Sequence, residues 1–254
     1  MARKNQEINI IQKHNDLVRH LKYKDIGFTV TEKKLINYFI SKLDRNDIDE
    51  ESFPLQVFKV VDICNLLKIK PGGFYEELRE ITLGINSKTF EIVKPNFDGR
   101  FIISQVNWFE RIRYDLGNGR LEVKFHGDLV PYLLRLHKRG QFTSYRIGES
   151  ISMKNKFSLS WYEYLLSYIS IRDEIEMDIE DIREFLQIDS SKHKRDIDLI
   201  NTCVRKPISE INLKSDLFIE IENIMNKNKI IAVKVKFRLK TLDEFLAQNW
   251  RMAR

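Results

Sequence analysis

Two stretches of the chain share one pattern of apolar and polar positions. The first, FTVTEKKLINYFIS, covers residues 28–41, and the second, FSLSWYEYLLSYIS, covers residues 157–170. In both, apolar residues recur every three or four positions, which is the spacing of one face of an α-helix. Each stretch also has the residue pair of a capping box near its start: Thr29 with Glu32, and Ser160 with Glu163. We therefore predict a helix at the beginning of each of two comparable units.

Further matches follow both stretches in the same order. VDICNLLKI ends at Ile69 and IEDIREFLQI ends at Ile188; both contain Asp-Ile and close on Leu-x-Ile. INSKTFEI begins at Ile85 and INLKSDLFIEI at Ile211, and both turn from Ile-Asn-x-Lys into β-prone residues. Matches that keep a fixed order indicate that one architecture is used twice.

Within each copy the predicted elements follow the order of a winged helix. After the first helix come a β-prone segment (LQVFKV or EIEM), a short helix (62–67 or 179–186), a turn, a second helix and a β-hairpin. The helix-turn-helix part is built to lay its second helix in a major groove. The predicted fold class is α+β, with two tandem winged-helix domains related by internal duplication, in residues 1–145 and 146–254.

In the second copy, the helix after the turn is the candidate reading helix. Its predicted buried stripe consists of Ile197, Ile200, Val204, Ile208 and Ile211. Pro207 removes a backbone donor within this stripe, so we expect a bend there. Arg can bind guanine bidentately, and Lys, Ser and Thr can reach bases or phosphates. The candidate DNA-binding residues at the start and on the opposite face are Lys192, Lys194, Arg195, Asp198, Thr202, Arg205, Lys206 and Ser209. A solvated amphipathic helix is the alternative.

The hairpin after this helix is a candidate wing. Its turn is predicted at residues 226–228, with Lys227 and Lys229 at the tip as further DNA-binding candidates. Along the last strand, apolar and mostly basic residues alternate: Ile231, Val233, Val235 and Phe237 on one face, and Ala232, Lys234, Lys236 and Arg238 on the other. Such a pattern fits a wing against DNA, and it also fits an ordinary solvated strand.

The corresponding helix of the first copy is a poorer candidate for DNA reading. Its predicted buried stripe is Phe74, Leu78, Ile81 and Ile85, and its outer face is Glu76, Arg79, Glu80 and Leu83. Acidic side chains facing a phosphate backbone are unfavourable. The longer predicted wing, residues 101–125, supplies possible phosphate contacts at Arg111, Arg113 and Arg120, and its apolar side could support dimer contacts.

Charge is distributed unevenly along the chain. The net charge is +6, but residues 191–240 hold twelve Lys/Arg and six Asp/Glu, while residues 171–190 hold two Arg and eight Asp/Glu. A basic region fits a polyanionic partner, and an unevenly charged solvated surface is the alternative. Cys64 and Cys203, the two cysteines, lie in apolar-periodic stretches, so we expect buried thiols in a reducing cytosol. No secretory signal or bilayer-spanning stretch is evident, and we expect a cytoplasmic protein.

The motifs of two enzyme classes, a rolling-circle nickase and an ATPase, are missing from this sequence. A rolling-circle nickase needs a His-x-His metal pair. No two of the five histidines are spaced in this way; they are His14, His20, His126, His137 and His193. No Gly-x-x-x-x-Gly-Lys loop is present for ATP. We therefore expect no enzyme activity, no metal and no cofactor.

Several strings of this sequence resemble one family. They are EKKLINYFISKLD from Glu32, DLVPYLLRL from Asp128, FTSYRI from Phe142, SWYEYLLSY from Ser160 and KPISEIN from Lys206. They resemble the iteron-binding plasmid replication initiators, the RepE-like or π-like Rep proteins, in order from about residue 15 to 237.

The resemblance implies a function without catalysis. Members bind repeated double-stranded sites, the iterons, at a plasmid origin as monomers, and often repress their own gene as homodimers on an inverted repeat. It implies dimerisation and auxiliary DNA contacts in residues 1–145, main DNA reading in residues 146–254, and recruitment of the host initiator and the replicative helicase. The helix matching residues 195–211 is the family's main reading helix, while the first copy departs from the family in lacking a lysine-rich helix face. The alternatives are a winged-helix transcriptional regulator outside replication, and a scaffold that binds only protein.

Overall fold

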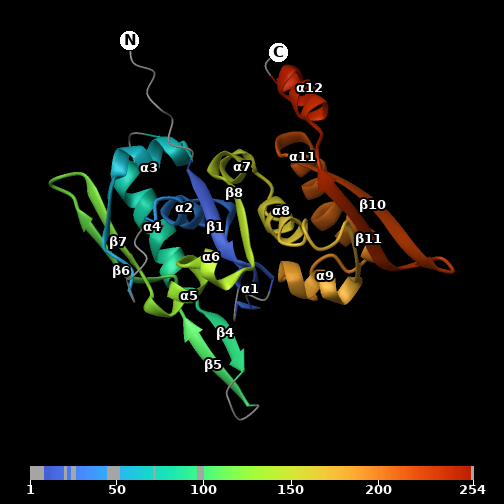
Figure 1. Cartoon of the computed structure of the whole chain (residues 1–254), viewed down its shortest axis with the longest axis horizontal. Helices are drawn as coiled ribbons and strands as arrows, with labels where there is room; N and C mark the ends of the chain where they lie inside the picture. Colours follow the sequence, from blue (N-terminus) through green and yellow to red (C-terminus); the bar gives the residue numbers. More distant parts are fainter. Residues whose placement is uncertain are drawn as a thin grey trace. The chain divides into compact units, whose positions relative to one another are not determined.

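A computed structural model describes residues 9–19, 22–23, 27–44, 52–70, 73–95 and 100–252 (Figure 1). The chain divides into two compact units, Met1–Ile151 (unit 1) and Ser152–Arg254 (unit 2). This division falls at the end of helix α7 (Ile147–Ser152), six residues after the boundary of 145/146 given by the sequence, and Asn37 of unit 1 binds residues on both sides of 145/146. Its Nδ2 donates to the Tyr145 hydroxyl at 2.9 Å and to Ser150 Oγ at 3.0 Å. The separate roles assigned to the two parts stay predictions.

Unit 1 contains a winged helix with additions. Helix α2, strand β3, helices α3 and α4, and the hairpin β6–β7 form the winged helix, and its sheet has the order β3-β7-β6. The elements of unit 1 are β1 (Ile10–His14), α1 (Asn15–Arg19), β2 (Lys22–Tyr23), α2 (Val30–Ser41), β3 (Gln56–Lys59), α3 (Val60–Leu67), α4 (Phe74–Asn86), β4 (Phe90–Pro95), β5 (Phe101–Val106), β6 (Phe109–Asp115), β7 (Arg120–Phe125), the 3-10 helix η2 (Gly127–Leu129), α5 (Val130–Leu133), α6 (Leu136–Arg139), β8 (Phe142–Arg146) and α7 (Ile147–Ser152).

The additions explain where the sequence prediction for the first copy was wrong. Residues 101–125 do not form one long wing: Phe101–Val106 is β5, which pairs with β4 in a separate sheet of order β2-β4-β5. The wing is the hairpin β6–β7 alone. The β-prone residues after Ile85 therefore enter an inserted hairpin, whereas those after Ile211 enter the wing itself.

Aromatic side chains fill the core of unit 1. The Phe39 ring lies 4.7 Å from Phe58 and 5.6 Å from Phe109 between centroids, and Phe125 lies 5.1 Å from Phe109. These rings join α2 to all three strands of the winged-helix sheet, which is how an amphipathic helix is fixed on a half-buried sheet.

The predicted capping box at the start of α2 is confirmed. Thr29 N–H donates to Glu32 Oε2 at 2.6 Å, and Glu32 N–H donates to Thr29 Oγ1 at 3.2 Å. Glu32 is 5% exposed and also pairs with Lys88, two residues beyond the end of α4. A single buried carboxylate thus caps one helix and ties it to another.

Gly84 leaves room for this carboxylate, since a Cβ at Gly84 would lie 2.4 Å from Glu32 Oε1. Ala is ordinarily favoured over Gly within a helix by about 1 kcal/mol. Here we expect Gly84→Ala to lower the free energy of unfolding by about 1 kcal/mol, because displacing Glu32 disturbs both the cap and the buried ion pair. Denaturant unfolding measures this change.

Gly148→Ala is the matched control for this prediction. Gly148 also lies within a helix, α7, but a Cβ there meets nothing within 4 Å. We expect this variant to be as stable as the native protein or slightly more stable. If Gly84→Ala behaves like Gly148→Ala, the described role of Glu32 is wrong.

Unit 2 is a second winged helix with the same sheet order. Its sheet runs β9-β11-β10, so the strand before the helix-turn-helix pairs with the last strand of the wing, as in unit 1. The prediction of two tandem winged-helix domains is confirmed. The elements of unit 2 are α8 (Ser158–Leu166), β9 (Glu174–Asp178), α9 (Ile179–Leu186), α10 (Asp196–Leu199), the π-helix η3 (Ile200–Arg205), α11 (Lys206–Lys214), β10 (Leu217–Asn226), β11 (Lys229–Leu239) and α12 (Leu242–Met252).

Two details of unit 2 differ from the sequence prediction. Helix α8 begins at Ser158, so Ser160 lies inside the helix and the second capping box is wrong. Ile197 is 41% exposed, whereas Leu199 is fully buried, so the apolar stripe of the reading helix starts at Leu199 and not at Ile197. The stripe continues as predicted through Ile200, Val204, Ile208 and Ile211.

Both cysteines are buried free thiols, as predicted. Burial raises the pKa of the Cys203 thiol to about 11, and it also raises the pKa of Cys64. A thiol with a raised pKa is a weak nucleophile, so these residues act as small apolar core residues.

Candidate nucleic-acid interface

The turn before the reading helix is held by Arg183 of α9. Its guanidinium donates to the carbonyl oxygens of Lys192 at 3.1 Å and of His193 at 2.7 Å. His193 has a φ of 51°, in the left-handed region. Lys192 and Lys194 lie in this turn with exposed side chains. Arg183, which sequence reasoning missed, therefore fixes the backbone that presents two of the predicted DNA-binding lysines.

The reading helix consists of α10, η3 and α11 and is not one regular α-helix. In η3 a backbone N–H group binds the carbonyl five residues earlier instead of four: Lys206 N–H donates to Asn201 O. Pro207 follows at the start of α11. The π turn lies immediately before Pro207 and lets the helix continue without the missing N–H group.

Most predicted residues of the reading helix lie on its outer side. Arg205, Lys206 and Ser209 are exposed, and Thr202 is half-buried. Arg205 Nη2 donates to Asn223 Oδ1 on β10 at 3.0 Å, which links the helix to the wing. Asn201, which was not predicted, is also exposed on this helix. These side chains form the outer face of the reading helix.

Two of the predicted residues bind each other. Arg195, immediately before α10, donates from Nε to Asp198 Oδ2 at 2.6 Å and from Nη2 to Asp198 Oδ1 at 2.8 Å. Hydrogen bonding to Asp198 and its charge raise the pKa of Arg195. An exposed pair of this kind contributes little to stability, so DNA could replace Asp198 as the partner, but the charge of Arg195 is already paired in the free protein.

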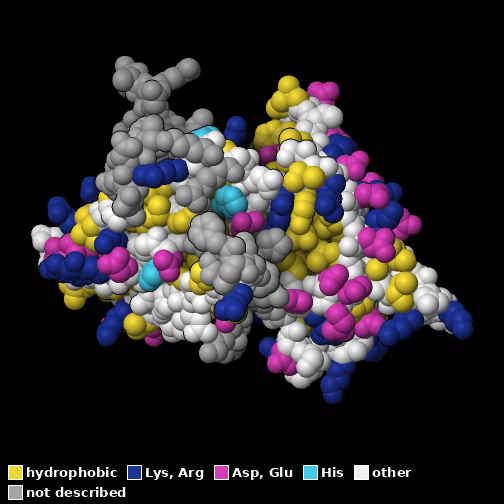
Figure 2. All heavy atoms as spheres, turned by 60° about the horizontal axis from the view of Figure 1, so that its bottom comes forward, with side chains coloured by type: hydrophobic (Ala, Val, Ile, Leu, Met, Phe, Trp, Pro, Cys, Tyr) yellow, Lys and Arg dark blue, Asp and Glu magenta, His cyan; other side chains and the backbone are white. Residues whose placement is uncertain are grey.

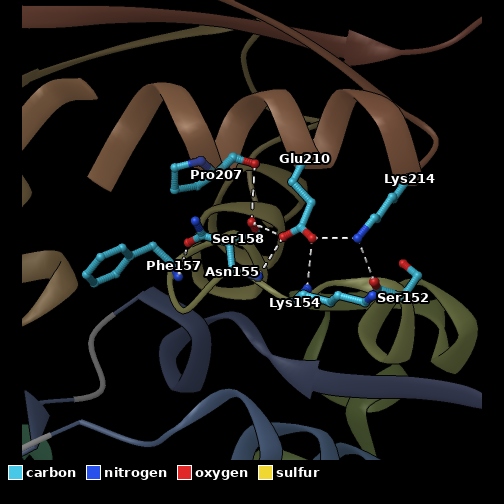
Figure 3. A network of polar contacts seen from close by, with 8 residues as sticks. All are labelled: Ser152, Lys154, Asn155, Phe157, Ser158, Pro207, Glu210 and Lys214. Carbon is cyan, nitrogen blue, oxygen red and sulfur yellow. Dashed lines mark hydrogen bonds and ion pairs between the residues drawn. The ribbon is translucent and has the colours of Figure 1, made fainter. Parts of the chain in front are cut away.

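Glu210 anchors the reading helix from its inner side (Figure 3). Its carboxylate accepts hydrogen bonds from the backbone N–H groups of Lys154 (2.9 Å) and Asn155 (2.8 Å), from Ser158 Oγ (2.7 Å) and from Lys214 Nζ (2.6 Å). Burial alone would raise the pKa of Glu210, but the hydrogen bonds from Lys214, Ser158 and the two backbone groups outweigh it and lower the pKa to about 2. The residue therefore stays ionised and holds α11 to the segment before α8.

Asn212 joins the end of the reading helix to the wing. Its side chain donates to Ile219 O at 2.7 Å and accepts from Ile219 N at 2.8 Å, as a neighbouring strand would. The helix and the hairpin are thus fixed to each other at Asn212 and, on the outer side, through Arg205 and Asn223.

The wing tip lies where the sequence predicts it. Asn226 pairs with Lys229, which leaves Lys227 and Asn228 in the turn, and Lys227 has a φ of 53°. Lys227 and Lys229 are both exposed. Two lysines therefore lie at the exposed end of the hairpin.

The predicted apolar face of β11 is wrong at one position. The register shifts so that Ile224 pairs with Ala232 and Met225 with Ile230. Ile231 therefore falls in a β-bulge and is 42% exposed, while Ala232 is 5% exposed. A bulge inserts one residue and turns the following side chains to the other face.

The outer surface of the wing sheet is not basic overall. Lys236 lies between Glu220 and Glu174, and Lys234 lies between Glu222 and Glu176, in the register of the three strands. Arg238 makes a bidentate pair with Glu244 of α12 at 2.8 Å. Figure 2 shows positive and negative side chains interspersed over the right-hand part of the molecule. The candidate interface is therefore the reading helix, its preceding turn and the wing tip, without the sheet surface.

The corresponding helix of unit 1, α4, has the predicted outer face, but its buried residues are Leu78, Thr82 and Ile85, while Phe74 and Ile81 are only half-buried. Glu76, Arg79, Glu80 and Leu83 are all exposed, and Leu83 is 58% exposed. Of the wing arginines, Arg113 lies 3.8 Å from Glu122. Acidic residues thus occupy the surface that a reading helix would present to phosphate.

Within the described residues there is no group of three or more His, Cys, Asp or Glu side chains that could hold a metal ion. No helix in the described ranges is long and apolar enough to cross a membrane.

Two winged helices in one chain, one with a basic outer helix face, define a tandem winged-helix protein. Residues 10–166 match the family model described as "Initiator Replication protein, WH1", and residues 178–237 match "Initiator Rep protein, WH2". The chain therefore belongs to the initiator replication protein family.

Similar proteins agree with this assignment. A replication initiation protein of Escherichia coli is 25% identical over 164 residues, which are 63% of this chain and 49% of that protein, so the match spans about half the length of this relative. The crystal structure of the Pi initiator protein in complex with iteron DNA has a TM-score of 0.69 at 17% identity and covers 92% of this chain and 99% of that one. Domains 2 and 3 of RctB give a TM-score of 0.52 at 14% identity, covering 89% and 98%. Both structures share the fold.

Proposed function

We propose that this protein is a plasmid replication initiator whose unit 2 binds repeated duplex sites, the iterons, at an origin. The main support is the outer face of the reading helix, where Arg205 and Lys206 are exposed. Glu210 and Asn212 fix the position of this helix in unit 2. Family membership and the similarity to a protein solved on iteron DNA support the choice of DNA as the partner. The proposed activity is binding and not catalysis.

Selection of duplexes from a random-sequence library tests this function. We expect the full chain to enrich one sequence that recurs in tandem in the DNA flanking its gene. A selected sequence that occurs there only as an inverted repeat at a promoter would favour the transcriptional regulator. Failure to enrich any sequence would refute base-specific binding.

Binding is expected to weaken steeply with salt. If Lys192, Lys194, Lys206, Lys227 and Lys229 each contact a phosphate, the slope of log K against log salt concentration is about −4.5. A fluorescence anisotropy titration at several salt concentrations measures it. Lys229→Ala should reduce the slope by about 1, whereas Lys236→Ala, between two glutamates on the sheet surface, should leave it unchanged. A flat salt response would contradict DNA binding by these residues.

The remaining roles rest on the family resemblance. We propose that the protein acts as a monomer on iterons and as a homodimer on an operator inverted repeat, with dimerisation in unit 1. Contacts to the host initiator and the replicative helicase belong to the same proposal. The acidic outer face of α4 supports a division in which unit 2 reads DNA and unit 1 contributes association.

A further inference from the structure

Pro207 leaves one backbone carbonyl of the reading helix without its usual donor. In an α-helix, Cys203 O would accept from the N–H of residue 207, but Pro207 has none. A buried carbonyl without a donor is strongly unfavourable. Cys203 is fully buried, so its carbonyl needs another partner.

Trp161 of α8 supplies that partner. Its indole Nε1–H donates to Cys203 O at 2.8 Å in the core of unit 2. Trp161 is fully buried, and its ring is held edge-on by Phe185, with centroids 5.0 Å apart, and by Tyr164 at 6.4 Å. Pro207 removes the donor that Cys203 O would have in an α turn, and in that turn the proline ring would also clash with this carbonyl. Trp161 binds the carbonyl from the core. Together they favour the π turn.

The π turn decides which residues share the outer face. It carries one residue more than an α turn, and each residue of an α-helix turns the chain by about 100°. If the π turn became an α turn, the residues before it would rotate about the helix axis by about 100° relative to Arg205 and Ser209. With the π turn in place, Asn201 lies one turn from Lys206, to which its carbonyl is bonded, and both are exposed. The Asn201 amide makes no hydrogen bond within the described residues.

We propose that Trp161 is a positioning residue for base reading. With Pro207 it holds the π turn that places Asn201 beside Lys206 and Arg205, and Asn201 reads a base from this position. An Asn amide matches the major-groove edge of adenine, so adenine is the base assigned to it. This inference rests on the proposed function.

The test uses the full chain and two kinds of variant. Trp161→Phe removes the indole donor. Trp161→Phe/Pro207→Ala restores a donor for Cys203 O on the helix itself, so that an ordinary α turn can form. Trp108→Phe is the matched control: Trp108 is 3% exposed in unit 1 and its Nε1 makes no hydrogen bond to the described residues, so this change removes similar volume but no hydrogen bond. Asn201→Ala tests the reading residue directly.

Each protein is put through selection from a random duplex library and thermal unfolding. We expect Trp161→Phe to lower the unfolding midpoint and the double variant to regain it. The double variant should nevertheless prefer a different sequence from the native protein, because its outer face is rotated. Trp108→Phe should select the native sequence. Asn201→Ala should bind the native duplex about tenfold or more weakly, lose its preference at one A·T pair, and bind random duplex unchanged.

Other outcomes overturn the inference. If the double variant selects the native sequence with native affinity, Trp161 is only a core residue. If the double variant does not regain the midpoint, the hydrogen-bond account of Trp161 is wrong. Equal effects of Asn201→Ala on native and random duplex would remove Asn201 as a base reader. If the native protein itself selects no sequence, the proposed function is wrong and the inference fails with it. If the native protein selects a sequence but the variants behave as described above, only the inference is wrong.

Discussion

Glu210→Gln is expected to lower the free energy of unfolding of unit 2 by about 3 kcal/mol, because four donors converge on this carboxylate. A glutamine offers one acceptor oxygen, and its amide group would face donors that stay in place. The loss of an ionised partner for Lys214 adds to the cost. Urea unfolding followed by circular dichroism measures the change. Glu222→Gln, on the exposed sheet surface, is the control and should change stability by less than about 0.5 kcal/mol.

Lowering the pH should remove the stabilisation that the Glu210 carboxylate provides in the native protein. The pKa of Glu210 is about 2 in the folded chain against an ordinary value of 4.5, so its contribution is fully present above pH 4.5. That contribution is lost as the pH falls from 4.5 towards 2, and it amounts to about 2 kcal/mol once partial solvent screening is allowed for. The stability difference between the native protein and Glu210→Gln should therefore shrink over this range. A difference that stays constant down to pH 2 would contradict the assignment.

Local patterns in the sequence predicted the elements that depend on local interactions. The capping box of Thr29 and Glu32 and the tip at Lys227 each lie within a few consecutive residues, and both were predicted correctly. The order of helices and strands in the two winged helices also follows from periodicity, because each element buries one face. The same reasoning placed Arg205, Lys206 and Ser209 on an exposed helix face.

Features that depend on distant residues were not predicted. Trp161 of α8 binds the carbonyl of Cys203 in the reading helix, and the same helix is anchored through Glu210 to residues 154, 155 and 158. The basic face of β11 is neutralised by glutamates on β9 and β10, which only the strand register brings together. The inserted hairpin β4–β5 is β-prone as a wing is, and only the strand pairing assigns it to a separate sheet.

Arg205→Ala is expected to reduce affinity for the selected native duplex by a factor of about 5 to 150, equivalent to roughly 1–3 kcal/mol, while binding to random duplex changes little. Arg205 is exposed on the outer face of the reading helix, and within the described residues its side chain donates a hydrogen bond to the neutral side chain of Asn223. Exchanging one neutral hydrogen bond for a bidentate contact to guanine costs little, so this guanidinium is available for base reading. Competition titrations with native and random duplexes measure both effects.

Alanine variants of two other basic residues, Arg195 and Lys227, serve as comparisons for Arg205→Ala. Arg195 is held bidentately by Asp198, and a base must displace that carboxylate, so Arg195→Ala should cost less on the native duplex than Arg205→Ala. Lys227 lies at the wing tip, where phosphate is the expected contact, so Lys227→Ala should weaken native and random duplexes by the same factor. If Arg205→Ala also weakens both duplexes equally, Arg205 contacts phosphate and base reading falls to the other residues of the outer face. If Arg195→Ala has the larger specific effect, the pair with Asp198 opens on DNA and the turn before α10 carries the sequence preference.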